Sequence, residues 1–124
     1  MKLGLTGKKA IVTGATRGIG LAIAECLANE GVDVAICARN AEEVSDTVMA
    51  LKAKGVTAIG EAIDVGNGQA YKEWLDTSAK SLGGLDIFIP NVTGGADNNE
   101  DDWRSHFEVD VMGTVRGCEV TLPY

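Results

Sequence analysis

A glycine-rich segment of the sequence has the composition and the setting of a phosphate-binding turn. Residues 13–20 (TGATRGIG) follow an apolar run and come directly before a stretch with helical periodicity. Gly14 would permit a tight turn, Gly18 would let the backbone approach a pyrophosphate, and Gly20 would let the helix pack closely on the strand. A helix N-terminus also offers unpaired N–H groups to an anion. We therefore expect a dinucleotide site, the alternative being a glycine-rich turn without a ligand.

The residues after the second apolar run bear on which nucleotide this site would accept. Ala38, Arg39 and Asn40 follow Cys37. A carboxylate at the first of these positions would accept the ribose hydroxyls of NAD and repel a 2′-phosphate. Instead, Arg39 offers a planar guanidinium suited to phosphate, and Arg17 of the glycine turn could reach the same group. This pattern favours NADP(H) over NAD(H), although both arginines could be solvated surface residues.

Short β-branched runs alternate with longer helical segments, and this alternation predicts the elements that would position these residues. The strand candidates are residues 9–13, 32–38, 57–63 and 86–89. Their continuous apolar cores are typical of strands that are covered on both faces. Because crossovers between parallel strands are right-handed, we expect a three-layer, Rossmann-like α/β fold with strand order 3-2-1-4. Without a linker or repeat, residues 1–124 form one predicted domain.

Four segments have the periodicity of amphipathic helices. The first would end before Gly31 and would turn one apolar face to the core, consisting of Ile19, Ala22, Ile23, Cys26 and Leu27. The second would end before Gly55, with an inward face formed by Val44, Val48 and Leu51. The third would run from about residue 69 to 82 and stop at Gly83-Gly84, with an inward face formed by Trp74, Leu75 and Ala79.

The fourth predicted helix is the longest, from about residue 101 to 122. It carries an apolar stripe at spacings of three and four, formed by Trp103, Phe107, Val111, Val115, Cys118 and Leu122. This stripe is compatible with packing in the core or against a second subunit. Just before it, residues 97–102 (DNNEDD) place oxygen ligands at alternate positions, as in a calcium loop, but the glycine and terminal glutamate of such a loop are absent. We expect these residues to stabilise the helix N-terminus instead, and we expect no metal site. We assign His106 to a surface or packing role.

Composition excludes several classes of function. Eighteen acidic and eleven basic residues give a formal net charge of −7, the wrong sign for a partner that is nucleic acid or an anionic membrane. The sequence starts without an apolar signal segment and has no run that could span a membrane, so we expect a cytoplasmic protein. Cys26, Cys37 and Cys118 lack metal-ligand spacing and lie in apolar stretches. We interpret them as buried free thiols.

The Gly-x-x-x-Gly-x-Gly spacing of residues 14–20, preceded by residues 7–12 (GKKAIV), resembles the short-chain dehydrogenases/reductases. The resemblance extends to Tyr124. It implies an oxidoreductase that transfers hydride between NADP(H) and a carbonyl or alcohol substrate. It also implies that the Thr13 hydroxyl ties the glycine turn to the loop after the fourth strand, although this threonine could equally satisfy a local backbone group.

The same resemblance implies further walls of a cofactor site. Asp64 and Val65 would receive the adenine, although an aspartate here could instead cap the next helix. After the fourth strand, Asn91 fits an asparagine of the family, while Pro90 supplies no N–H group and residues 92 and 93 are bulkier than the family's Ala-Gly. The cofactor-binding residues that we predict are Gly14, Thr16, Arg17, Gly18, Ile19, Gly20, Ala38, Arg39, Asn40, Asp64, Val65, Asn91, Val92, Thr93 and Gly94.

The residues that the family uses for chemistry are not found in this sequence. Asp110 takes the place of an asparagine of the family's proton relay, and the family's Tyr-x-x-x-Lys does not occur. The resemblance covers about the first half of a usual member, and in a 3-2-1-4 sheet the apolar fourth strand would be an exposed edge. We therefore expect a chain truncated after its fourth β-α unit. The alternative is a nucleotide-binding or interaction module without catalysis, and in either case the last helix could form a homo-oligomer.

Overall fold

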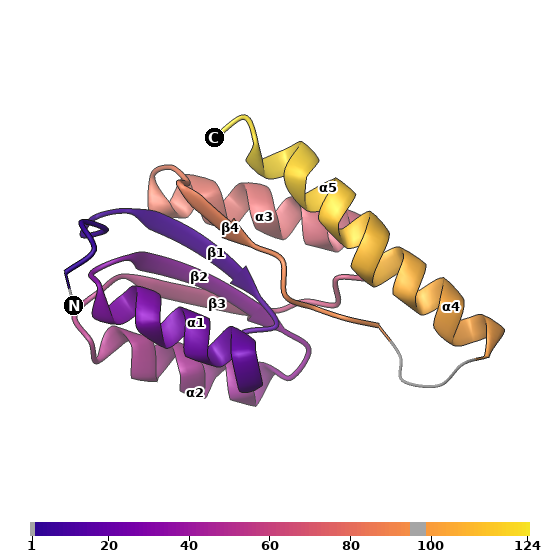
Figure 1. Cartoon of the computed structure of the whole chain (residues 1–124), viewed down its shortest axis with the longest axis horizontal. Helices are drawn as coiled ribbons and strands as arrows, with labels where there is room; N and C mark the ends of the chain where they lie inside the picture. Colours follow the sequence, from indigo (N-terminus) through magenta and orange to yellow (C-terminus); the bar gives the residue numbers. More distant parts are fainter. Residues whose placement is uncertain (1, 95–98) are drawn as a thin grey trace.

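A computed structural model describes residues 2–94 and 99–124, and its centre is a four-stranded parallel sheet (Figure 1). The strands are β1 (Lys9–Thr13), β2 (Asp33–Ala38), β3 (Ala58–Ala62) and β4 (Ile87–Ile89). Their order is β3-β2-β1-β4, and every pairing is parallel. The predicted strand order is therefore confirmed, and no strand limit differs from the prediction by more than one residue.

Helices cover both faces of the sheet, which gives the three predicted layers (Figure 1). One face carries α1 (Gly18–Asn29) and α2 (Ala41–Lys52), and the other carries α3 (Gly68–Leu82) and α5 (Met112–Thr121). A short helix, α4 (Glu100–His106), continues into α5 through a π-helical turn, Phe107–Val111, and extends beyond the sheet. Side chains from alternate positions of β1 enter the two resulting cores: Val12 packs on the α1–α2 side and Ile11 on the α3 side.

The face of α1 that packs on the sheet overlaps only in part with the predicted one, in which Ile23 and Leu27 do pack against the core. Ile19 is 73% exposed and Cys26 is also exposed, whereas Gly20, Ala24 and Ala28 are buried. These three residues recur every four positions and are small, so they let the helix lie close to the strands. Periodicity alone could not reveal this, because a face of small residues and a face of larger ones have the same spacing.

Within the described residues, the apolar stripe of the last helix is also not part of the core. The observed helical segment has nearly the predicted limits, but it contains a π-helical turn between two α-helices. The exposed fractions of the side chains are 69% for Trp103, 53% for Phe107 and 80% for Leu122. The buried positions are again small, namely Gly113, Gly117 and Thr121. A Cβ atom at Gly117 would lie 2.4 Å from the ring of Phe88, so the glycine permits contact between α5 and β4. The stripe therefore faces away from the chain's own core.

The three cysteines lie in different surroundings, and the prediction that all are buried is wrong. Cys37 is fully buried in β2, Cys118 is half-buried, and Cys26 is exposed on the outer side of α1. Burial raises the pKa of the Cys37 thiol to about 12, opposed by a hydrogen bond from the Gly14 backbone. At neutral pH, Cys37 is therefore protonated and shielded from solvent. Because the thiolate is the reactive form of cysteine, this thiol is unreactive.

We predict that iodoacetamide at pH 8 alkylates Cys26 in the folded protein and leaves Cys37 unmodified, because Cys26 is exposed and Cys37 is fully buried. Peptide mass spectrometry before and after denaturation in urea measures this difference. Labelling of Cys37 in urea is the internal control. Equal labelling of both thiols in the folded protein would contradict the described position of β2.

Candidate functional site

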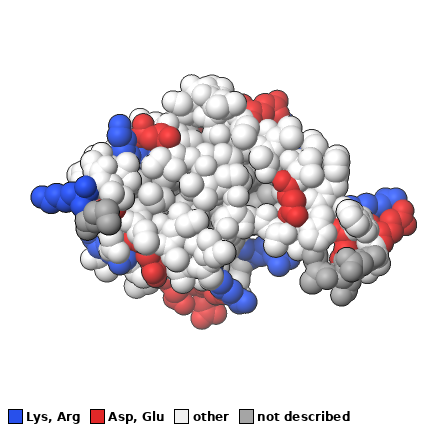
Figure 2. All heavy atoms as spheres, viewed as in Figure 1, with Lys and Arg blue, Asp and Glu red and all other residues white. Residues whose placement is uncertain are grey.

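A cavity of about 1000 Å³ lies where the strands end at their carboxyl termini. Figure 2 shows the surface hollowed between the body of the protein and α4, with basic side chains at the edge of the hollow. Most of the predicted site residues line this cavity, namely Gly14, Thr16, Arg17, Ala38, Arg39, Asn40, Asp64, Val65, Asn91, Val92, Thr93 and Gly94. Crossovers leave β1 and β4 toward opposite faces of the sheet, so a crevice opens between them, as is usual for ligand sites in open α/β sheets.

The glycine turn has the backbone that its predicted roles require. Gly14 has φ +61° and Gly18 has φ +53°, in the left-handed region that favours glycine. A Cβ atom at Gly18 would meet nothing within 4 Å, so the backbone there is open to a ligand. At Gly20, in contrast, a Cβ atom would lie 2.0 Å from the Gly14 carbonyl oxygen. Of the predicted residues, Gly18, Ile19 and Gly20 do not line the cavity: Gly20 supports the turn from behind, and the Ile19 side chain points to solvent.

Two hydrogen bonds tie the glycine turn to the loop after β4. The Asn91 backbone N–H donates to Thr13 Oγ1 at 2.9 Å, and the Asn91 side-chain amide donates to the Gly14 carbonyl at 3.3 Å. Thr13 thus makes the long-range contact that the resemblance implied and not a local one. The two loops that form opposite sides of the crevice are fixed relative to each other.

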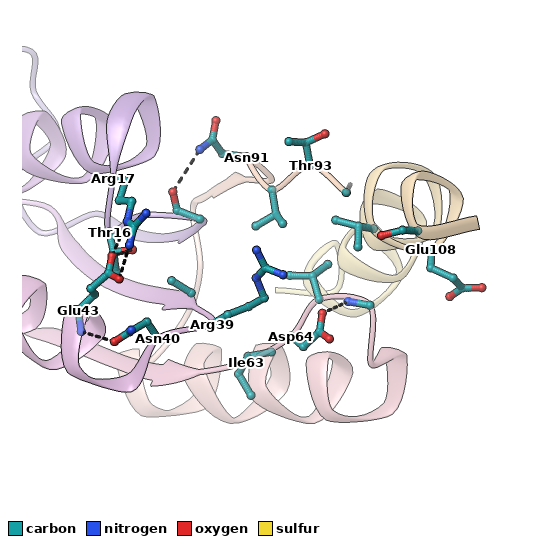
Figure 3. Close-up of a pocket in the computed structure, with 18 residues that line it drawn as sticks. Thr16, Arg17, Arg39, Asn40, Glu43, Ile63, Asp64, Asn91, Thr93 and Glu108 are labelled. Carbon is teal, nitrogen blue, oxygen red and sulfur yellow. Dashed lines mark hydrogen bonds and ion pairs between the residues drawn. The ribbon is translucent and has the colours of Figure 1, made fainter. Parts of the chain in front are cut away.

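The two arginines of the cavity differ in their partners (Figure 3). Arg17 donates from Nε and Nη2 to the two carboxylate oxygens of Glu43, each at 2.6 Å, whereas Arg39 extends into the cavity. Among the described residues, none hydrogen-bonds or ion-pairs with the Arg39 side chain. The hydrogen bond with Arg17, with the attraction of its charge, lowers the pKa of the Glu43 carboxyl, and the same contact raises the pKa of Arg17. Glu43 was not predicted, although its place in the first turn of α2 was a detectable signal.

Asn40 and Asp64 have structural contacts at the cavity edge. The Asn40 side chain caps α2 by accepting the Glu43 backbone N–H at 3.0 Å. Asp64 Oδ1 accepts the Gly66 N–H at 2.9 Å, and the cap of α3 is Asn67, so Asp64 is not the helix cap that its sequence position allowed. The side chain of Val65 is buried against α5.

Asp110 holds the loop after β4 from behind, outside the cavity lining. Its carboxylate accepts the Gly94 N–H at 2.9 Å and the Thr93 hydroxyl at 3.1 Å, and lies 2.8 Å from His106 Nδ1. Partial burial opposes ionisation of this carboxyl, but the hydrogen bonds from His106, Gly94 and Thr93 outweigh it and lower the pKa of Asp110. This contact is consistent with the packing role expected for His106.

Two remaining features lie near α4. Asn99 caps this helix by accepting the Asp102 N–H at 2.9 Å, and the first turn is acidic, as expected for residues that stabilise a helix N-terminus. The first two residues of the acidic run, Asp97 and Asn98, lie outside the described residues. Within the described ranges, no group of three or more potential ligands is arranged for a metal ion.

The cavity also includes residues that the sequence analysis missed, namely Ile63, Gly66, Ser105, Glu108 and Val109.

Comparison with known proteins identifies relatives with this arrangement. Isoepoxydon dehydrogenase patN of Penicillium expansum is 34% identical over 125 residues, covering 98% of this chain and 48% of that protein. L-Sorbose reductase of Gluconobacter frateurii, crystallised with NADPH and L-sorbose, has a TM-score of 0.91 and 33% identity, covering 99% of this chain and 49% of that chain. A short chain dehydrogenase/reductase of Burkholderia phymatum in complex with NAD has a TM-score of 0.88 and 31% identity, covering 96% and 44%.

The chain therefore spans about half the length of these relatives. No helix within residues 2–94 and 99–124 has both the length and the apolar character needed to cross a membrane. Residues 8–124 match the family described as short chain dehydrogenase, which includes nearly the whole sequence. Together with the parallel sheet and the glycine turn at its carboxyl end, this match shows that the chain belongs to the short-chain dehydrogenase/reductase family of oxidoreductases.

Proposed function

We propose that the cavity binds NADP(H) and that the chain supplies the cofactor-binding half of an oxidoreductase acting on carbonyl or alcohol substrates. The observation that carries this proposal is the left-handed glycine turn at Gly14, which lines the same cavity into which the Arg39 guanidinium extends without a partner among the described residues. The first feature suits a pyrophosphate, and the second suits a 2′-phosphate. The other predicted residues that line the cavity would form its remaining walls.

The choice of NADP(H) over NAD(H) rests on the residues of this chain and not on its relatives. The L-sorbose reductase structure contains NADPH, whereas the Burkholderia phymatum structure contains NAD. In this chain, Ala38 ends β2 without the carboxylate that would bind two ribose hydroxyls. Arg39 follows it, and its positive charge, which has no partner within residues 2–94 and 99–124, can attract phosphate.

When bound, the nicotinamide would supply or accept a hydride, and the residues of this chain would orient it. Asn91 and Thr93 lie on the loop that would pass beside the nicotinamide ribose, and Asp110 holds that loop through Gly94. No Tyr-x-x-x-Lys occurs in the sequence, so we place the acid-base chemistry in residues of a longer polypeptide. The same observation favours a second candidate, a non-catalytic nucleotide-binding module. NADPH binding without NADPH oxidation at 340 nm across a panel of carbonyl compounds would favour the module.

Two further features of this proposal concern assembly and location. The exposed row of Trp103, Phe107 and Val111 offers an apolar surface along α4 and the π-helical turn, which suits a homo-oligomer. A cytoplasmic location stays a prediction from the sequence. Nucleic acid and membrane surfaces are poor partners for a chain of net charge −7.

We predict that Arg39→Asp weakens NADPH binding by about tenfold or more, because repulsion replaces attraction at the 2′-phosphate. NADH binding should change by less, since NADH lacks that phosphate. Titration of each nucleotide by fluorescence measures both effects. Unchanged NADPH affinity would contradict the assignment of Arg39.

We predict that Gly18→Ala weakens binding of NADPH and NADH alike by about tenfold, ~1.4 kcal/mol, because the added methyl group would occupy space needed by the pyrophosphate. Isothermal titration calorimetry gives both affinities. Gly83→Ala is the matched control: Gly83 has φ +81°, equally open surroundings and a place outside the cavity, so it carries comparable backbone strain. If both variants bound the nucleotides equally well, Gly18 would not contact the cofactor.

A further inference from the structure

At the glycine-turn end of the cavity, one of the two arginines is already paired with a carboxylate. Glu43 engages two of the five N–H donors of Arg17 in a parallel, bidentate pair. The Thr16 hydroxyl lies 3.5 Å from the same carboxylate, on Oε1. All three residues line the cavity, so a ligand in the cavity would meet a neutralised arginine and an adjacent carboxylate.

The position of Glu43 is fixed by the start of α2. It stands in the first turn of this helix, where a negative charge interacts favourably with the helix dipole, and its backbone N–H is held by the Asn40 cap. Its side chain is 28% exposed, whereas that of Arg17 is 81% exposed. The carboxylate is therefore the less exposed and better anchored partner, and it sets the position of the exposed guanidinium.

A solvent-exposed ion pair of this kind is weak enough to be broken by a competing anion. A phosphate near Arg17 would have to displace Glu43 or bind beside its negative charge, and either event reduces affinity. We propose that Glu43 is a specificity-determining residue that neutralises Arg17 and thereby lowers the affinity of the site for 2′-phosphorylated nucleotides. Arg39 is then the main cation for that phosphate. This inference rests on the proposed NADP(H) site.

The test compares Glu43→Gln with wild type in NADPH and NADH titrations by calorimetry at low ionic strength. Glutamine keeps the size and a hydrogen-bonding oxygen of the side chain but removes its charge. We expect NADPH to bind about three- to tenfold more tightly and NADH to change by less than about twofold, with the NADPH gain shrinking in high salt. Glu42→Gln is the matched control, because it removes the same charge from the same helical turn at an exposed residue outside the cavity lining.

A double-mutant cycle tests whether Glu43 acts through Arg17. In an Arg17→Gln background, Glu43→Gln should no longer tighten NADPH binding beyond the change seen for Glu42→Gln. Three results would overturn the inference: no gain for NADPH, an equal change for both nucleotides, or the same gain with and without Arg17. A wild-type protein that binds neither nucleotide would instead refute the proposed function, so the two failures are distinguishable.

Discussion

The close approach of α1 to the end of β1 is the constraint on which the cavity depends. With no side chain at Gly20, the first turn of the helix rests against the Gly14 carbonyl, and a Cβ atom there would clash at 2.0 Å. The same carbonyl accepts the Asn91 amide, so the glycine turn also fixes the loop after β4. A larger residue at this point would separate the helix, the strand and the loop together. The phosphate-binding geometry and the packing of the sheet therefore share one contact.

The sequence was sufficient to predict the strands, their order and most of the cavity lining, because these follow from strong local signals. Continuous apolar runs identify buried parallel strands, and right-handed crossovers then leave few possible orders. The glycine spacing further identified the family before any contact was known. These signals are all short in sequence, and each is set by backbone geometry.

The failures arose where a side chain's environment depends on distant parts of the chain. The inward face of α1 was predicted only in part: Ile23 and Leu27 pack against the core, but the fully buried positions include Ala24 and Ala28. Glu43 was missed because its partner, Arg17, lies 26 residues away and belongs to another element. Asp110 was compared with a catalytic asparagine, whereas its observed bonds hold residues 93 and 94. None of these pairings leaves a periodic trace in the sequence.

The π-helical turn between α4 and α5 divides the last helical segment into two parts with different rotational phase. An α-helix advances by about 100° per residue, so the wider turn offsets the directions in which side chains before and after it point. The glycine face of α5 can thus follow the sheet while Ser105 of α4 lines the cavity. Removing one residue from this turn would restore a single phase and rotate one of these two surfaces out of place. The length of this segment is consequently as constrained as its composition.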